Sequence, residues 1–279
     1  MAKPKITGDF NMRMPEIIPF FVEGKDAKAV YDALKGLTSG TMGYDEKTQT
    51  FYGSTPFVAA KIDTLVRPFG LRLADVRDLS RPEVMAMIKN RHYTDAPAFV
   101  LRSMNDSNSR NLPLIKRIAE EVERVNGKVQ FPVLITGFDV KPLQDEGYGI
   151  DIVPRDNFTA VYDERLNGEN NGKKFSDVDE LGLPKFDKGG ERTFLARNQG
   201  LSRLFVDGNL DLYSYIESLA SSSGDGRVVL IRGEAVAEKF AQSYQKQLKA
   251  NFGRLQERAK TEYELKLERL QAVGKELGL

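Results

Sequence analysis

The sequence predicts an α+β fold, because helical patterns dominate its front half and strand-like patterns follow them. The strongest helical pattern runs from Leu112 to Val125, where Leu114, Ile115, Ile118 and Val122 recur at helical spacing. From residue 129 the period changes, and short β-rich runs are separated by polar turns. With 279 residues and a hydrophobic fraction of 41%, the chain is long and apolar enough to bury a core.

The first 78 residues contain one short apolar run and two helical patterns. The run Glu16–Glu23 predicts a strand or turn, and Asp26–Leu37 and Thr55–Val66 predict helices. Between the helices, the Gly-, Ser- and Thr-rich stretch 38–54 predicts a loop or a hairpin. We expect residues 1–78 to form a small N-terminal accessory module.

From residue 79 onward, helical patterns give way to strands. Ser80-Arg81-Pro82-Glu83 has the pattern of a capping box and predicts the start of a helix. Asn126-Gly127 predicts the end of the helix that begins at Leu112. The remaining patterns predict strands at Ala98–Leu101, Phe131–Phe138, Tyr148–Val153 and Arg192–Arg197, a turn at 144–147, a loop at 167–174 and an irregular stretch at 179–190.

The last part of the chain predicts a helical tail. Between Glu234 and Leu277, apolar residues recur mostly at steps of three and four, which indicates one long helix or two helices broken near Gly253. Its charges alternate in sign, which favours packing on its own chain over an intermolecular coiled coil, although an oligomer through this helix stays open. The predicted division is therefore residues 1–78, 79–231 and 232–279.

Composition excludes several classes of function. Lys plus Arg total 41 and Asp plus Glu total 40, which argues against general nucleic-acid binding. Without cysteine, and with His92 as the only histidine, the chain has no thiolate chemistry and no multi-histidine metal site. It shows neither a signal-peptide pattern nor a membrane span, which predicts a cytoplasmic protein. His92 with Asp95 indicates acid–base catalysis only weakly, and no obligatory cofactor is expected.

Several acidic residues offer an alternative function. Carboxylates near predicted strand ends suit an oxygen-ligand metal site, as in a metal-dependent hydrolase or nuclease. No recognisable ligand spacing links them, and charged strand ends are commonly only solvated. This alternative therefore stays open beside a structural scaffold organised by the tail; its residues are Asp139, Asp151, Asp156, Asp163 and Glu164.

The segment Gly200–Ile231 has the pattern of a framework with an exposed face. A strand would place one alternating set of side chains in the core and the other in solvent. The set expected at the surface is rich in Tyr, Ser, Gly, Asn and Asp, a composition typical of antibody-like binding surfaces. An ordinary polar hairpin is the alternative. The residues expected to be buried are Leu204, Leu210, Leu212, Leu219, Val228 and Val229.

Motifs in this segment resemble the diversified segment of variable proteins of diversity-generating retroelements, and in particular their archaeal group. The motifs are Gly-Leu-Ser-x-Leu from residue 200, Leu-x-Leu-x-Ser from 210, Leu-Ala-x-Ser from 219 and Gly-Arg-Val-Val from 226. Upstream stretches at 89–103, 132–140, 152–156 and 179–184 resemble the same group. The resemblance spans Leu79 to Ile231 and leaves the first module and the tail uncovered.

This resemblance implies a C-type lectin-like fold that displays a hypervariable surface and has no catalytic role. In such systems a reverse transcriptase copies a template repeat with mutations at adenines, and the copy replaces the variable segment of the gene. The implied ligand is set by the particular variant and is most often a protein. Core substitutions cost roughly 2–5 kcal/mol, so the variable side chains must lie outside the core. Replacing several of Phe205, Tyr213 and Tyr215 is therefore expected to leave the melting temperature almost unchanged.

The resemblance also implies which residues can occur at variable positions. Mutation of an Asn codon that keeps its pyrimidine third base cannot produce Lys, Gln, Glu, Met or Trp. Between Arg203 and Asp225 the chain has no Lys, Gln, Met or Trp, and only Glu217 departs from the rule. Glu217 is therefore either an invariant position or the product of a different codon class. The predicted ligand-binding positions are Arg203, Phe205, Asp207, Gly208, Asn209, Asp211, Tyr213, Tyr215, Ile216, Ser218, Ser221, Ser223, Gly224 and Asp225.

Overall fold

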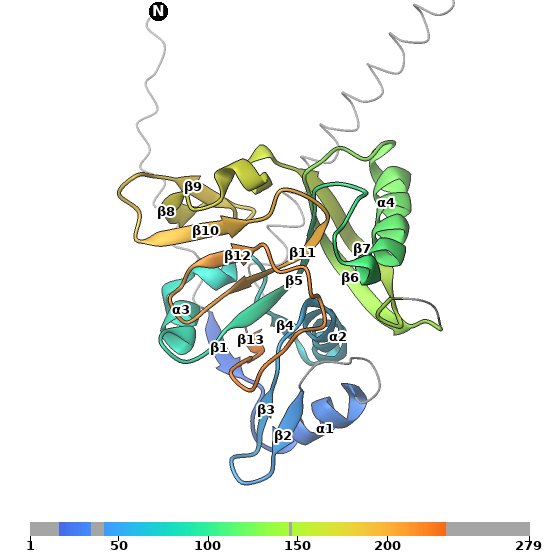
Figure 1. Cartoon of the computed structure of the whole chain (residues 1–279). Coiled ribbons are helices and arrows are strands. Elements are labelled where there is room, and N and C mark those ends of the chain that lie inside the picture. Colours follow the sequence, from blue (N-terminus) through green and yellow to red (C-terminus); the bar gives the residue numbers. More distant parts are fainter. Residues whose placement is uncertain (1–16, 35–41, 145–146, 233–279) are drawn as a thin grey trace, which may run out of the picture. The chain divides into compact units, whose positions relative to one another are not determined.

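The computed structural model describes residues 17–34, 42–144 and 147–232, and these residues have a mixed α+β fold (Figure 1). They contain four α-helices, an eight-stranded mixed sheet, a three-stranded sheet and one separate hairpin. The predicted α+β class is confirmed. The predicted helical tail from Glu234 to Leu277 lies outside the described residues. None of the described helices is long and apolar enough to cross a membrane.

The large sheet places the segment Gly200–Ile231 near its middle. Its strand order is β7-β6-β5-β11-β12-β10-β8-β9, and all neighbours are antiparallel except β10 and β12. Every residue of β5 is buried, as expected of a strand covered on both faces. In chain order the strands are β5 (Thr94–Leu101), β6 (Val133–Pro142), β7 (Ile150–Tyr162), β8 (Lys174–Val178), β9 (Pro184–Phe186), β10 (Arg192–Ala196), β11 (Leu201–Val206) and β12 (Leu212–Ser214).

The small sheet joins the two ends of the described chain. Strand β13 (Val229–Arg232) lies between β1 (Ile18–Phe21) and β4 (Leu71–Leu73), antiparallel to both. The hairpin β2 (Gly43–Asp45) and β3 (Thr50–Tyr52) falls inside the stretch predicted as a loop or hairpin. Strands from both sides of residue 78 thus share one sheet, and residues from both sides share one core. The predicted boundary between an N-terminal module and a second domain at residue 78 stays a prediction.

Four helices cover the sheets: α1 (Lys25–Leu34), α2 (Pro56–Val66), α3 (Pro82–Ile88) and α4 (Leu112–Asn126). Helix α2 packs against β5 and β6, and α4 packs against β7 (Figure 1). The hydroxyl of Thr55 caps α2 by accepting a hydrogen bond from the Val58 N–H at 3.1 Å. Helix α4 ends at Gly127, whose φ of 75° is the left-handed conformation that glycine adopts without strain.

Two predicted details differ from the structure. The capping box at Ser80 is wrong, because α3 begins at Pro82 and is preceded by Arg81, while the Ser80 hydroxyl accepts a hydrogen bond from Arg192 at 2.9 Å. Strand β9 lies in the stretch predicted to be irregular. It has only three residues and begins with proline, so neither length nor alternation marks it as an edge strand.

Candidate functional site

Strand β11 anchors the segment Gly200–Ile231 between two neighbours of the large sheet. It pairs with β5 on one side and with β12 on the other, where Phe205 lies opposite Tyr213. The chain then leaves β12 through a long loop and ends in β13, the central strand of the small sheet. The backbone of the segment is therefore fixed at three places in two sheets.

The predicted framework positions are almost all in the core. Leu204, Leu219 and Val229 are completely buried, and Leu212 and Val228 are 1% exposed. Leu210 is the exception: it is half-buried in the turn before β12, and its φ is 68°. The buried framework predicted from the sequence is thus confirmed for five of these six residues.

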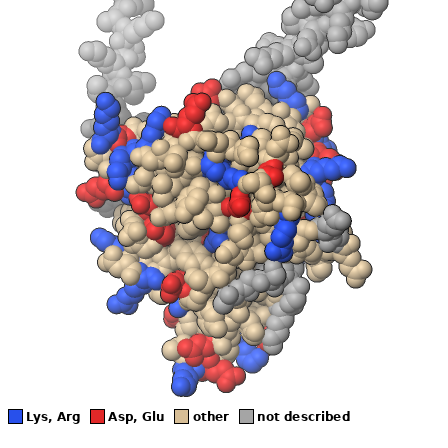
Figure 2. Space-filling view, in the orientation of Figure 1, with Lys and Arg blue, Asp and Glu red and all other residues tan. Residues whose placement is uncertain are grey.

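Most of the predicted ligand-binding positions reach the surface. The face shown in Figure 2 carries both acidic and basic side chains, in its middle as well as towards its edges. Asn209, Tyr215, Ser221, Ser223, Gly224 and Asp225 are exposed, and Asp207, Gly208, Asp211, Tyr213, Ile216 and Ser218 are half-buried. Two of the predicted positions, Arg203 and Phe205, are buried instead, so the expectation that replacing Phe205 leaves the melting temperature almost unchanged does not hold for that residue.

Arg203 is a core residue, and its predicted place on the surface is wrong. Its side chain points into the interior, where its Nε lies 2.7 Å from Asp95 Oδ1 on the paired strand β5. Its other nitrogens donate to the carbonyl oxygens of Ser54 and Ser221. The negative charge of Asp95 raises the pKa of Arg203 against the lowering effect of burial. A buried pair of this kind holds strands together and is not free to contact a ligand.

Four aromatic rings form a row across the start of β5, β11 and β12. Tyr93 meets Phe205 edge-on at 5.7 Å, and Phe205 stacks on Tyr213 at 4.9 Å between centroids. Tyr213 then contacts Tyr215 at 5.6 Å. The row runs from the buried Phe205 to Tyr215, which is 43% exposed, and therefore presents tyrosine faces to solvent from a rigid base.

A tight turn connects β11 to β12. Asp207 Oδ1 accepts hydrogen bonds from the N–H groups of Asn209 at 3.0 Å and Asp211 at 3.1 Å. The Asp211 carboxylate in turn accepts from the N–H of Thr193. Burial, and then the negative charge of Asp207, raise the pKa of Tyr213 to about 12. The turn thus carries two oriented carboxylates beside one tyrosine.

Tyr93 fixes the backbone of the loop before β13. Its hydroxyl accepts a hydrogen bond from the Ser223 N–H at 2.9 Å and lies 3.1 Å from Ser222 Oγ. Its main chain pairs with Asp225 and Arg227. The close approach leaves no room at Gly226, where a Cβ would lie 2.8 Å from the Tyr93 hydroxyl. The loop is therefore tied down through groups that do not depend on its exposed side chains.

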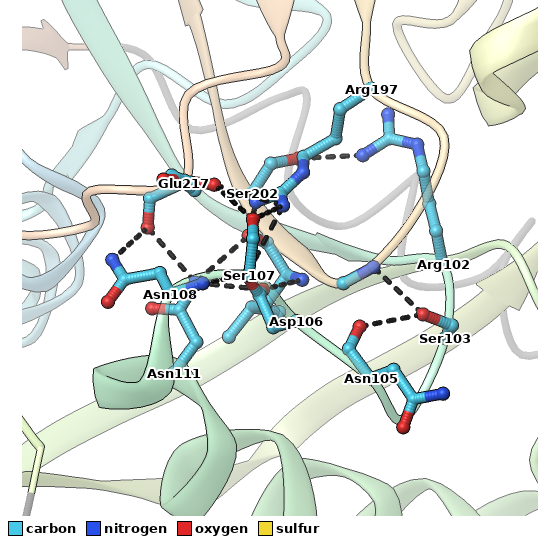
Figure 3. A network of polar contacts seen from close by, with 12 residues as sticks. Arg102, Ser103, Asn105, Asp106, Ser107, Asn108, Asn111, Arg197, Ser202 and Glu217 are labelled. Atoms are coloured by element: carbon cyan, nitrogen blue, oxygen red, sulfur yellow. Dashed lines mark hydrogen bonds and ion pairs between the residues drawn. The ribbon is translucent and has the colours of Figure 1, made fainter.

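A polar network holds the beginning of the segment (Figure 3). The buried carboxylate of Asp106 accepts hydrogen bonds from the Leu201 N–H at 2.7 Å and from Asn111 Nδ2 at 2.9 Å, and it pairs with Arg197 at 3.2 Å. Gly200 has a φ of 73°, and a Cβ there would lie 2.2 Å from this carboxylate. Only glycine fits where the segment starts.

The same network reaches Glu217, the residue that departs from the codon rule. Its carbonyl oxygen accepts from Asn111 Nδ2 at 3.0 Å, and its carboxylate accepts from Ser107 Oγ at 2.7 Å and pairs with Arg197 at 3.1 Å (Figure 3). Tyr148 adds its hydroxyl, which accepts from the Leu219 N–H at 3.2 Å. Glu217 is thus held through its main chain and its side chain, although the side chain is 47% exposed.

Sequence reasoning missed Asp106, Asn111 and Tyr148, the residues that support the segment from outside. Asp106 and Asn111 come from the loop just before α4 and Tyr148 from the turn before β7, all far from the segment in the chain. Only their types gave a signal, since a short polar loop of Asn, Asp and Ser residues precedes a strong helix.

The predicted catalytic candidates are used for packing and pairing. The ring of His92 lies edge-on to Phe21 at 5.3 Å, and its Nδ1 is 3.2 Å from the Asp225 carbonyl oxygen. Burial, and then the charge of Arg227, lower the pKa of His92. Asp95, its predicted partner, is instead bound to Arg203. The structure does not bring His92 and Asp95 together as an acid–base pair.

The acidic residues of the alternative function have separate partners. Asp139 pairs with Lys61 at 3.2 Å, Asp151 with Arg117 at 2.7 Å, and Asp163 with Arg165, while Asp156 is exposed. Tyr162 donates a hydrogen bond to Glu164 at 3.0 Å. Within residues 17–34, 42–144 and 147–232, no three His, Asp or Glu residues form a group that could hold a metal ion.

Comparisons with family models, curated proteins and solved structures found no match for this chain. The case for a function therefore depends on the residues and their geometry.

Proposed function

We propose that the chain is a ligand-binding display protein whose exposed residues in the segment Gly200–Ile231 are diversified by a retroelement. In this proposal the described domain serves as a C-type lectin-like scaffold, works in the cytoplasm and needs no cofactor or catalytic group. The ligand is a protein in most variants.

The observation that carries the proposal is that the groups that hold the backbone of the segment are different from the side chains that reach its surface. Main-chain groups and buried side chains such as Leu204, Leu212 and Leu219 hold its backbone, while most of the predicted variable positions are exposed or half-buried. A surface that tolerates replacement requires this arrangement, because stability then does not depend on the replaced residues. Glu217, which the codon rule excludes, has framework contacts.

The geometry sharpens the set of proposed variable positions. Arg203 belongs to the framework, since its replacement would leave Asp95 buried without a partner. Phe205 is buried, and its ring stacks on the ring of Tyr213. The proposed display residues are therefore those from Asp207 to Asp225 that reach the surface.

The test is to sequence the DNA around the gene. The proposal expects a nearby imperfect repeat of the codons for Gly200–Ile231, differing at adenines, beside a reverse transcriptase gene. It also expects the differences to fall at surface codons such as Tyr213 and Tyr215 and to leave Leu212 and Glu217 unchanged. A genomic neighbourhood with neither repeat nor reverse transcriptase contradicts diversification and leaves a binding surface of fixed sequence.

A further inference from the structure

The tyrosines at the exposed end of the aromatic row lie next to two carboxylates. Asp207 and Asp211 flank Tyr213 in the turn that leads into β12. We call Asp207, Asp211, Tyr213 and Tyr215 the acid–tyrosine patch. Its charge and its ring faces decide which chemistry fits it.

Within the described residues, neither carboxylate of the patch is paired with a cationic side chain. They accept hydrogen bonds from main-chain N–H groups, from the amide of Asn209 and, at Asp207, from the Tyr213 hydroxyl, and none of these donors carries a positive charge. Arg192 lies close enough for Asp211 to affect its pKa. However, Arg192 is buried. It donates a hydrogen bond to the carbonyl oxygen of Leu210, and its guanidinium group lies over the ring of Phe175.

The rings of the patch are held in place before any ligand arrives. Tyr213 is stacked on Phe205 with an angle of 18° between the ring planes, and the Tyr215 ring lies 5.6 Å from the Tyr213 ring between centroids. Aromatic faces attract cations because their π-electrons are negative, and nearby carboxylates strengthen this attraction. Both features of the patch therefore select for positive charge, and two unneutralised carboxylates repel phosphate groups.

We propose that the acid–tyrosine patch docks an arginine or lysine side chain exposed on a protein partner. This inference rests on the proposed function and names the partner chemistry of this particular variant. Binding places the cation over a tyrosine face and within reach of both carboxylates. The contact is weakened by salt, because the patch is partly exposed.

The test is to select a random peptide library displayed on phage against the full chain. The double variant Asp207→Asn/Asp211→Asn is selected in parallel. Asparagine keeps the oxygen that accepts the main-chain N–H groups, so the turn is preserved while two charges are removed. The matched control is Glu120→Gln/Glu123→Gln, which removes two charges from the exposed side of α4.

The peptides recovered on the native chain are expected to contain Arg and Lys about two- to fivefold more often than the input library, as for one exposed cation–π contact. The control keeps this enrichment, and the Asn double variant loses it. The proposal is overturned if the native chain recovers acidic or uncharged peptides or none at all, or if the Asn variant shows the same enrichment. A missing template repeat would instead refute diversification and leave this result unaffected.

Discussion

The segment Gly200–Ile231 contains two regions. They differ in whether neighbouring groups hold the side chains as well as the backbone, or the backbone alone. In β11 every residue is buried, and both the backbone and the side chains are held by β5 and β12. Between Asp207 and Asp225 the backbone is held by Asp207, Tyr93 and the network around Asn111, while most side chains reach solvent. The difference teaches that a segment can have its backbone held by hydrogen bonds while most of its side chains reach solvent, as the proposed display function requires.

The largest expected effect comes from β11. Replacing Asp95 by Ala leaves the Arg203 guanidinium buried without its carboxylate, which should lower the free energy of unfolding by about 3–5 kcal/mol. Urea unfolding followed by circular dichroism measures this loss. The double variant Asp95→Leu/Arg203→Met should lose less than Asp95→Ala alone, because it removes both charges. A double variant that is no more stable than the single one would contradict this reading of the pair.

The network at the start of the segment should have the next largest effect. Asp106→Ala removes the acceptor of the Leu201 N–H and of Asn111, and we expect a loss of about 2–3 kcal/mol. Asp106→Asn keeps one acceptor oxygen in place and should lose less. Thermal unfolding of the two variants compares them, and equal losses would show that the charge of Asp106 matters more than its hydrogen bonds.

Within the aromatic row, the expected cost falls from the buried end to the exposed end. Phe205→Ser removes a ring that is 9% exposed and should cost about 2 kcal/mol, whereas Tyr215→Ser should change stability by less than about 0.5 kcal/mol. Melting temperatures of these two variants and of Tyr213→Ser measure the gradient. A large loss for Tyr215→Ser would place that residue in the framework and break the comparison between the two regions.

The smallest effect is electrostatic and concerns Tyr213. Its pKa of about 12 lies above the usual value of 10, so the folded state favours the neutral hydroxyl. The resulting contribution to stability is present below pH 10 and is lost as the pH rises towards 12. Ultraviolet titration of tyrosinate should show this late ionisation disappear in Tyr213→Phe. In Asp207→Asn it should move to lower pH, and an unchanged titration there would rule out the influence of Asp207.

The sequence predicted what depends on local periodicity. The helix from Leu112 has a buried stripe at helical spacing, and Leu212 and Ser214 alternate with the tyrosines in β12, so both elements are visible in the chain. The burial of Arg203 was not visible, because it depends on Asp95, which is more than a hundred residues away. A lone charged residue in a strand predicts exposure unless its partner is known.

The candidate site shows the same limit. Tyr215 was placed at the surface correctly from the alternation of a strand, and the loop from Ser221 to Asp225 from its turn-like residues. The hydrogen bonds that hold the segment were not predicted, because Tyr93 binds Ser223 and Tyr148 binds Leu219 through hydroxyl groups that lie far away in the chain. Long-range hydrogen bonds leave no periodic trace in a sequence, so a framework of this kind requires coordinates.

The small sheet also brings the first and the last strand of the described domain together. Ile18 and Arg232 are paired across neighbouring strands, so the chain enters and leaves the domain at one place. A host protein could therefore carry residues 17–232 as an insertion within a single surface loop, with both junctions side by side. The proposed display surface would then be transferred between host proteins as a unit. Neither the described domain nor the host protein would need to be redesigned.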